Sequence, residues 1–292
     1  MKYALIDIGS NSIRMNVYNK DNIRKEVFSK KYMAGLADFV EDGKLSKKGE
    51  KKLIKVLSSQ KLLLNYLPID DVYVFASASL RNVENGEEIA KKIKKELNLN
   101  VDIISAEKEA YYGVLGVMEK YDFKKFYAVD IGGGSTEFTY VKDGNIKDGK
   151  YLKIGSLSLF RDYVENIVPN DRELENIYNK IDEEMGEVDV KTDILVSTGG
   201  TARAIGNILE EIRGGSNEFY NIEEVADFIS KMKSRNNKTM LHTIMVVPER
   251  LHTITTGAAI LYSIMEKLGV QTTYVSKYGV REGYLKEKIK EN

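Results

Sequence analysis

The sequence predicts an α/β protein made of two homologous halves that face each other across a cleft. Segment Ala4–Ser12 lies over Tyr127–Ser135, with Asp, Ile, Gly and Ser at matching places 123 residues apart. Similar strands follow each copy of this motif. The length of 292 residues fits roughly two domains at about 150 residues each.

The first half begins with three predicted strands and continues with alternating helices and strands. Short apolar runs predict the strands, and apolar residues at helical spacing predict the helices. The predicted strands are Tyr3–Ile8, Met15–Tyr18, Ile23–Phe28, Val72–Ala76 and Val101–Ile104, and the predicted helices are Leu45–Leu64, Glu87–Leu97 and Ala106–Lys120. Ser105 is a suitable N-cap for the last of these helices, which has Glu107 and Glu109 in its first turn.

The pattern restarts after the charged stretch 120–125. The predicted strands are Phe126–Asp130, Glu137–Val141, Ile146–Ile154, Ile194–Ser197 and Thr272–Ser276, and the predicted helices are Leu157–Glu165, Asp171–Glu187, Thr201–Ile212, Ile222–Lys233, Leu251–Leu268 and Arg281–Ile289. We expect one domain over residues 1–122, joined by the C-terminal helix 281–292, and a second over 123–280.

Composition excludes several classes of protein. The chain has no cysteine and two histidines, which excludes disulfides, thiol nucleophiles and a three-histidine zinc site. Lysine plus arginine and aspartate plus glutamate both number 44, so we expect no partner of the duplex nucleic acid class. No segment has the roughly 20 apolar residues that span a bilayer. Asp7 lies where a signal peptide needs an uninterrupted apolar region. We therefore expect no membrane association and a cytoplasmic location.

Each repeated motif places a glycine turn where a buried strand ends. Gly9, Gly132, Gly133 and Gly134 are expected to take positive φ angles and to let the backbone approach a ligand. Successive N–H groups in such a turn bind an anion, and the hydroxyls of Ser10, Ser12, Ser135 and Thr136 add donors. Asp7 and Asp130 would repel a phosphate directly, so we expect them to hold Mg²⁺ or water. The alternative is two tight hairpins with strand-end aspartates.

A third glycine-rich turn, Ser197–Thr201, joins a predicted strand to a predicted helix. The helix N-terminus beside Gly199, Gly200 and Thr201 could receive an anion. A simple tight turn explains the same residues.

The chain resembles the exopolyphosphatase/guanosine pentaphosphate phosphatase (Ppx/GppA) family of the actin–hexokinase–chaperone superfamily, in its short form without a C-terminal helical extension. Seven motifs in the family's order carry the resemblance: Asp7–Ser12 with Arg14, Ser77–Asn82, Ile104–Ala110 with Gly116 and Val117, Asp130–Glu137, Ser197–Thr201, Pro248–Arg250 and Gly279–Gly283. The resemblance implies two ribonuclease H-like domains, a divalent cation as cofactor and a homodimer.

The resemblance also assigns roles to individual residues. Glu109 matches the catalytic glutamate that activates water, and Glu137 matches a position near the metal and water. Arg81, expected in the loop Ala76–Glu87, becomes a phosphate clamp, because a guanidinium can bind phosphate oxygens bidentately. Asn11 belongs to the first phosphate-binding turn. Each of these residues has an alternative interpretation. Glu109 could be a first-turn glutamate that only favours the helix dipole, Glu137 a charge on an edge strand, and Arg81 an arginine of a surface loop.

The expected activity is Mg²⁺-dependent release of terminal orthophosphate from polyphosphate, or of the 5′ γ-phosphate from guanosine pentaphosphate. One departure from the family is Lys108, which stands where the family usually has a glutamate and could alter substrate preference. Two alternatives stay open: a non-catalytic sensor that binds guanosine tetra- or pentaphosphate, and a kinase or ATPase of the same superfamily.

Overall fold

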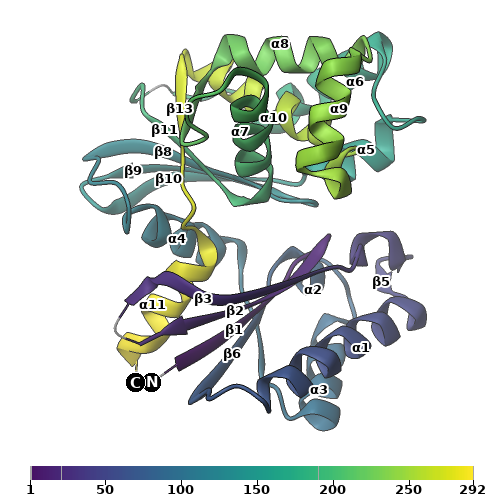
Figure 1. Ribbon diagram of the computed structural model, residues 1–292, viewed down its shortest axis with the longest axis vertical. Coiled ribbons are helices and arrows are strands. Elements are labelled where there is room, and N and C mark those ends of the chain that lie inside the picture. Colours follow the sequence, from purple (N-terminus) through teal and green to yellow (C-terminus); the bar gives the residue numbers. More distant parts are fainter. Residues whose placement is uncertain (1, 21, 190, 292) are drawn as a thin grey trace. The chain divides into compact units, whose positions relative to one another are not determined.

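The computed structural model describes residues 2–20, 22–189 and 191–291 and divides into two compact units (Figure 1). The first unit comprises Met1–Tyr112 and Val280–Asn292, and the second comprises Gly113–Gly279. The division falls inside helix α4 (Ala106–Val117). Asn292, the last residue of the predicted segment 281–292, lies outside the described residues.

The first unit is built on a five-stranded mixed sheet in the order β3-β2-β1-β6-β7. Strands β1 and β2 are antiparallel, whereas β1, β6 and β7 run parallel. The strands are β1 (Lys2–Ile8), β2 (Ser12–Asn19), β3 (Asn22–Met33), β6 (Asp71–Ala76) and β7 (Val101–Ile103), with a small hairpin of β4 (Val40–Glu41) and β5 (Lys44–Leu45). The helices are η1 (Leu36–Phe39), α1 (Lys47–Leu64), α2 (Ala78–Arg81), α3 (Gly86–Leu97), the start of α4, and α11 (Val280–Glu291).

The two faces of this sheet differ in chemistry because side chains alternate along each strand. Ile6 and Met15 belong to the apolar face, whose core includes Leu53 and Leu57 of α1 and Ile93 of α3. The other face carries a polar stripe along β2, and α11 covers it, with Tyr284 packed 4.8 Å from the Phe75 ring (Figure 1).

The second unit contains a six-stranded sheet in the order β10-β9-β8-β11-β13-β12. The strands are β8 (Lys125–Ile131), β9 (Thr136–Lys142), β10 (Asn145–Leu152), β11 (Leu195–Thr198), β12 (Phe219–Asn221) and β13 (Thr272–Val275). The helices are α5 (Ser156–Tyr163), α6 (Asp171–Met185), α7 (Gly199–Arg213), α8 (Ile222–Lys233), α9 (Asn237–Val246), η2 (Pro248–Arg250) and α10 (Ile254–Leu268). Helix α10 is the centre of its core, with Ile260, Leu261 and Ile264 fully buried.

In both sheets the first strand has an antiparallel neighbour on one side and a parallel neighbour on the other, and in the second sheet the edge strand β12 is antiparallel to β13. In the first unit β1 lies between β2 and β6, and in the second unit β8 lies between β9 and β11. The predicted α/β class with a repeated half is confirmed. Among the described residues, no helix is long and apolar enough to span a membrane.

Some predicted boundaries differ from the observed ones. Leu45 belongs to β5, and α1 starts only after Ser46, whose side chain accepts a hydrogen bond from the Gly49 N–H. The helix predicted from Leu251 begins at Ile254, because the 3-10 turn η2 precedes it. Arg81 does not lie in a loop: it ends the one-turn helix α2.

Helix α9 was not predicted, because its pattern is inverted. Thr239 and Thr243 are buried, whereas Leu241, Ile244 and Met245 are exposed. The Thr243 hydroxyl donates to the Thr239 carbonyl at 2.8 Å, so the buried polar atom has an internal partner. A search for buried apolar residues at helical spacing cannot detect such a helix.

Candidate active site

The two glycine turns close in the same way. The Gly9 N–H donates to the Ser12 carbonyl at 3.0 Å, and the Gly132 N–H donates to the Ser135 carbonyl at 2.9 Å. Each turn follows the first strand of its sheet, at the carboxyl end of that strand. Ligands of open α/β sheets bind at this end of the parallel strands. The motif repeat in the sequence is therefore also a repeat of backbone geometry.

The reason for glycine in these turns is close approach and not a positive φ. None of Gly9, Gly132, Gly133 and Gly134 has a positive φ, so this part of the prediction is wrong. A Cβ at position 9 or 132 would lie 3.0 Å from the carbonyl oxygen that closes the turn. Gly155 packs closely against the backbone of Gly133, because a Cβ on Gly155 would lie 2.5 Å from the carbonyl carbon of Gly133.

Each turn is fastened to its own unit through its carbonyl groups. In the first turn, the Ser10 carbonyl accepts from Ala37 at 3.1 Å, and the Asn11 carbonyl accepts from Gly35 at 2.8 Å. In the second turn, the Gly132 carbonyl accepts from the Ser156 N–H at 2.9 Å and the Gly133 carbonyl accepts from both Leu157 and Ser158 at 2.9 Å. The N-terminus of α5 thus holds the second turn in place.

The polar side chains predicted to bind phosphate fall into two sets. Ser10, Asn11 and Ser12 are half-buried. Ser135, Thr136 and Thr201 are buried and donate inward, to Glu137 Oε1 at 2.9 Å, to the Ile154 carbonyl at 2.9 Å and to the Ile131 carbonyl at 2.9 Å, respectively. Thr136 and Thr201 therefore stabilise the sheet edge with their hydroxyls.

The residue opposite each aspartate differs between the units. Asp7 pairs with Arg14 across β1 and β2, whereas Asp130 pairs with Glu137 across β8 and β9. Directly opposed side chains lie on the same face, with Cβ atoms about 5 Å apart. The first turn is thus accompanied by a carboxylate and a guanidinium, and the second by two carboxylates.

Asp7 also faces a second guanidinium, which comes from α11. Arg281 Nε lies 3.9 Å from Asp7 Oδ2, and Arg281 Nη1 donates to Asn16 Oδ1 at 2.9 Å. Burial and the neighbouring charge of Arg281 lower the pKa of Arg14, while Asp7 opposes that shift. The sequence motif around Arg281 gave no indication of this contact.

The third glycine turn brings two charged side chains to the start of α7. Gly199 has a φ of +77°, and a Cβ there would lie 2.0 Å from Asp130 Oδ1. A Cβ on Gly200 would lie 2.2 Å from Arg250 Nη2. The turn thus holds the Asp130 carboxylate over one glycine and the Arg250 guanidinium over the next. Arg250, in a motif quoted above without a role, is a cation that sequence reasoning missed.

Arg81 and Glu109 form an ion pair at the carboxyl edge of the first sheet. Arg81 Nη1 lies 2.6 Å from Glu109 Oε2 and donates to the Ile104 carbonyl at 3.1 Å. The hydroxyl of Ser79, in the same short helix as Arg81, donates to the Ile8 carbonyl just before the glycine turn. Helix α2 thus connects the end of β1 to the start of α4.

Helix α4 begins as its sequence indicates. The Ser105 hydroxyl accepts from the Lys108 N–H at 3.2 Å, as expected of an N-cap. Glu107 and Lys108 are exposed, whereas Glu109 is half-buried against Arg81. A hydrogen bond from Ser105 and the charge of Arg81 lower the pKa of Glu107.

One pair of carboxylates in the second unit has the oxygen ligands that Mg²⁺ prefers. Among the described residues, no three acidic, histidine or cysteine side chains form a metal site by themselves. Mg²⁺ usually binds through one or two carboxylates and completes its shell with water and substrate oxygens. Asp130 opposite Glu137 fits this pattern. Each aspartate also has a guanidinium in its surroundings: Asp7 lies near Arg14 and Arg281, and Asp130 and Arg250 lie over the consecutive glycines 199 and 200.

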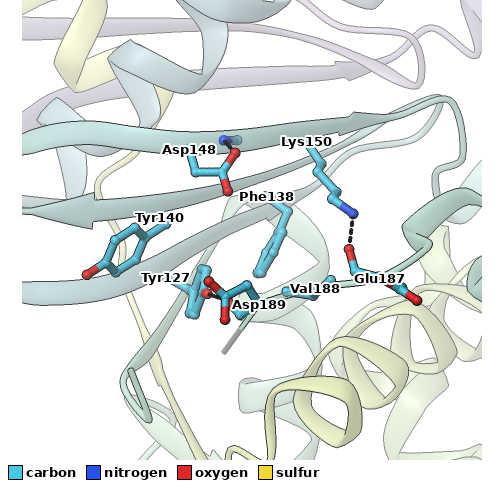
Figure 2. A pocket seen from close by; sticks show the side chains of 9 residues that line it. Tyr127, Phe138, Tyr140, Asp148, Lys150, Glu187, Val188 and Asp189 are labelled. Carbon is cyan, nitrogen blue, oxygen red and sulfur yellow. Dashed lines mark hydrogen bonds between the residues drawn. The ribbon is translucent and has the colours of Figure 1, made fainter. Parts of the chain in front are cut away.

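A cavity of about 340 Å³ in the second unit lies away from these residues (Figure 2). Its lining consists of Tyr127, Phe138, Tyr140, Asp148, Gly149, Lys150, Glu187, Val188 and Asp189. The strand residues among them alternate with Asp130 and Glu137, so they occupy the opposite face of the sheet. Figure 2 shows Lys150 directed at the Glu187 main chain and Asp148 and Asp189 at the rim. The cavity is therefore separate from the candidate active-site residues Asp130 and Glu137.

The repeated mixed sheet with a glycine turn after its first strand defines a duplicated α/β protein. The chain belongs to the Ppx/GppA phosphatase family, whose model matches residues 17–292. It is 22% identical to exopolyphosphatase 1 of Mycobacterium tuberculosis, covering 99% of this chain and 88% of that protein. It is 24% identical to the guanosine-5′-triphosphate,3′-diphosphate pyrophosphatase of Aeromonas hydrophila, covering 97% of this chain and 58% of that protein. The crystal structure of an exopolyphosphatase from Cytophaga hutchinsonii is similar in fold, with a TM-score of 0.87 at 19% identity, covering 100% of this chain and 98% of that one.

Proposed function

We propose that this chain is a Mg²⁺-dependent phosphoric anhydride hydrolase. Its substrate is inorganic polyphosphate, from which it releases terminal orthophosphate, or guanosine pentaphosphate, from which it releases the 5′ γ-phosphate. The names of the relatives supply these two substrates. The observation that carries the proposal is the Arg81–Glu109 pair at the carboxyl edge of the first sheet.

In this proposal Glu109 orients the attacking water and accepts its proton. The water oxygen forms a bond to the terminal phosphorus while the P–O bond of the anhydride breaks. The electron pair of that bond stays on the oxygen of the shortened chain, and the proton passes to the Glu109 carboxylate. A positioned base of this kind contributes roughly 10²–10⁴-fold to the rate. The half-buried setting of Glu109 supports this role.

Arg81 serves both the base and the phosphate. One of its nitrogens donates to Glu109 and to the Ile104 carbonyl, which fixes the plane of the guanidinium. A fixed planar guanidinium has further N–H donors for phosphate oxygens. Arg81 therefore neutralises the charge of the terminal phosphate and aligns it with the base.

The glycine turns supply backbone donors for the phosphates. Their carbonyls are bound within their own units, which fixes the backbone before substrate arrives. Preorganised donors stabilise developing charge without reorganising during the reaction. The candidates lie in residues Gly9–Ser12, Gly132–Thr136 and Gly199–Thr201, except that the N–H groups of Gly9 and Gly132 already close their own turns. Arg250 adds a cation beside Gly200.

Asp130 and Glu137 would hold the divalent cation, with the Ser135 hydroxyl fixing the Glu137 carboxylate at 2.9 Å. When bound, Mg²⁺ neutralises charge on the phosphate oxygens. Asp7 is the second metal candidate, and the second carboxylate opposite Asp130, that of Glu137, favours Asp130 as the principal ligand.

The test is phosphate release with Mg²⁺ from short polyphosphate, long polyphosphate, guanosine pentaphosphate and ATP at equal concentrations of terminal phosphate. We expect release from polyphosphate, guanosine pentaphosphate or both. Binding of guanosine pentaphosphate with no release from any substrate would identify a sensor. ATP consumption that depends on an added acceptor would identify a kinase.

The matched variants are Glu109→Gln and Glu107→Gln, at two glutamates in the first turn of α4 that are separated by Lys108. Glu109→Gln should lower kcat by roughly 10²–10⁴-fold, with substrate binding largely kept. Glu107 is exposed, so Glu107→Gln should keep wild-type turnover. Equal turnover of both variants would remove Glu109 from the mechanism.

A further inference from the structure

We propose that Arg281, in the last helix of the chain, is a positioning residue for the first glycine turn. It acts by holding Asp7 through a polar cluster around the buried Asn16, made of Asp7, Arg14, Asn16, Glu26 and Arg281. The effect on turnover rests on the proposed function, whereas the coupling between Arg281 and Asp7 does not.

The Arg281 side chain enters the sheet face from the start of α11. It is 12% exposed and contacts two strands. Its Nη1 donates to Asn16 Oδ1 on β2 at 2.9 Å, and its Nε lies 3.9 Å from Asp7 Oδ2 on β1. One planar guanidinium can donate a hydrogen bond to Asn16 while its charge forms an ion pair with Asp7. Asp7 precedes the turn closed by Gly9 and Ser12.

Asn16 passes this restraint on to β3. It is fully buried, and its amide nitrogen donates to Glu26 and, at 3.5 Å, to the Ser29 hydroxyl. An amide has both an acceptor and donors. Because Arg281 satisfies the acceptor of Asn16 and Glu26 satisfies its donors, the Asn16 side chain has one orientation in this cluster.

The charges of the region explain why a cation is required. The carboxylates of Asp7, Glu26 and Glu282 share the surroundings of two guanidinium groups, Arg14 and Arg281. Burial opposes the charged form of Arg281, but Glu282, Tyr18, Asp7 and Glu26 together raise its pKa. Loss of Arg281 would remove one of the two guanidinium charges near these carboxylates, and Asp7 would lose its ion pair with Arg281 Nε.

Docking of α11 has anchors of its own. The Tyr18 hydroxyl donates to Glu282 Oε1 at 2.8 Å, and Tyr284 packs on Phe75 and on Tyr112. A Cβ on Gly283 would lie 1.9 Å from the Tyr112 carbonyl oxygen, so the helix lies close against α4. The helix therefore has contacts that hold it while Arg281 is changed.

The test compares three variants: Arg281→Ala, Arg281→Lys and Tyr18→Phe. Phosphate release and thermal unfolding are measured for each, with KM and kcat determined separately. Arg281→Ala should lower kcat by about 100-fold, the effect of a small misplacement of reacting groups, with KM changed much less. Lysine keeps the charge but not the planar guanidinium, so the kcat of Arg281→Lys should lie between that of the wild type and that of Arg281→Ala. Added guanidinium ion should restore part of the Arg281→Ala activity, and methylammonium should not.

Tyr18→Phe separates positioning from docking, because it removes the Glu282 contact and leaves Arg281 in place. It should lower the unfolding temperature and keep kcat. If Tyr18→Phe lost as much kcat as Arg281→Ala, or if Arg281→Ala kept the wild-type kcat, the positioning role would be overturned.

A double-mutant cycle tests the contact between Arg281 and Asp7 without any measurement of activity. Arg281→Ala and Asp7→Asn, alone and combined, should change the free energy of unfolding non-additively, because residues in one network couple. Additive changes would overturn the inference even in an active enzyme. A wild-type protein that releases no phosphate would overturn the proposed function and leave this cycle to decide whether Arg281 holds Asp7.

Discussion

Arg81 Nη1 lies 2.6 Å from Glu109 Oε2, and the two side chains are 16% and 12% exposed. This ion pair joins the one-turn helix α2 to the first turn of α4. Removing one partner from a largely desolvated pair leaves an uncompensated charge, which costs far more than losing a surface pair. The proposed base and the proposed phosphate clamp are therefore one unit, and a change in either is expected to affect the other.

Arg81→Lys should lower kcat/KM by about 10–100-fold, although the charge is kept. Arg81 Nη1 contacts both Glu109 and the Ile104 carbonyl, and a lysine ammonium lacks the rest of the planar guanidinium that this proposal directs at the phosphate oxygens. A hydrogen bond to a charged group is worth about 1.5–3 kcal/mol. Steady-state phosphate release measures the loss. Arg161→Lys is the control, since Arg161 is about half exposed beside Asp162. An unchanged kcat/KM for Arg81→Lys would show that charge alone suffices.

Gly199→Ala should abolish phosphate release, because the new Cβ would lie 2.0 Å from Asp130 Oδ1 and would push that carboxylate away. Gly214 has a similar φ of +76°, with nothing within 4 Å of its Cβ position. Gly214→Ala therefore carries the backbone strain, about 1–2 kcal/mol, without the clash. Thermal unfolding and phosphate release are measured for both variants. Equal activity of the two would show that the position of Asp130 does not matter.

Sequence reasoning found the parts of the site that local pattern determines. The repeated motif at Asp7 and Asp130 indicates two similar turns, and both close through the same hydrogen bond. The N-cap Ser105 follows from its position before an apolar stripe, and its hydroxyl caps α4. The reason for glycine in the turns was misjudged, since φ depends on how the turn closes and not on composition.

The contacts that escaped sequence reasoning are long-range. Arg281 and Asp7 are separated by nearly the whole chain, and so are Tyr18 and Glu282. Arg250 meets Gly200 only because η2 follows α9 across the start of α7. Nothing in the local pattern around an arginine states which strand it will reach, so such pairs become visible only when the fold brings them together.

The Mg²⁺ requirement should respond differently to the two aspartates. Asp130→Asn removes one of two opposed carboxylates, so the Mg²⁺ concentration for half-maximal activity should rise by about tenfold or more. Asp7→Asn changes a carboxylate that lies near Arg281, so it should lower kcat while that Mg²⁺ concentration stays the same. Mg²⁺ titrations of phosphate release compare them. A rise for Asp7→Asn equal to that for Asp130→Asn would make Asp7 a metal ligand of the same rank.

Stability should fall in alkali, in part because of Tyr178. Burial, with Tyr262 and Glu266 nearby, raises the pKa of Tyr178 from 10.0 to about 12. The folded state thus keeps this proton after the unfolded chain has lost it, so the contribution is complete below about pH 10 and is lost between about pH 10 and pH 12. Two pKa units correspond to at most about 3 kcal/mol. Urea unfolding across this range should show a smaller loss for Tyr178→Phe than for the wild type, whereas Tyr66→Phe, at a side chain that is 78% exposed, should follow the wild type. A Tyr178→Phe curve that matches the wild-type curve would mean that Tyr178 titrates alike in both states.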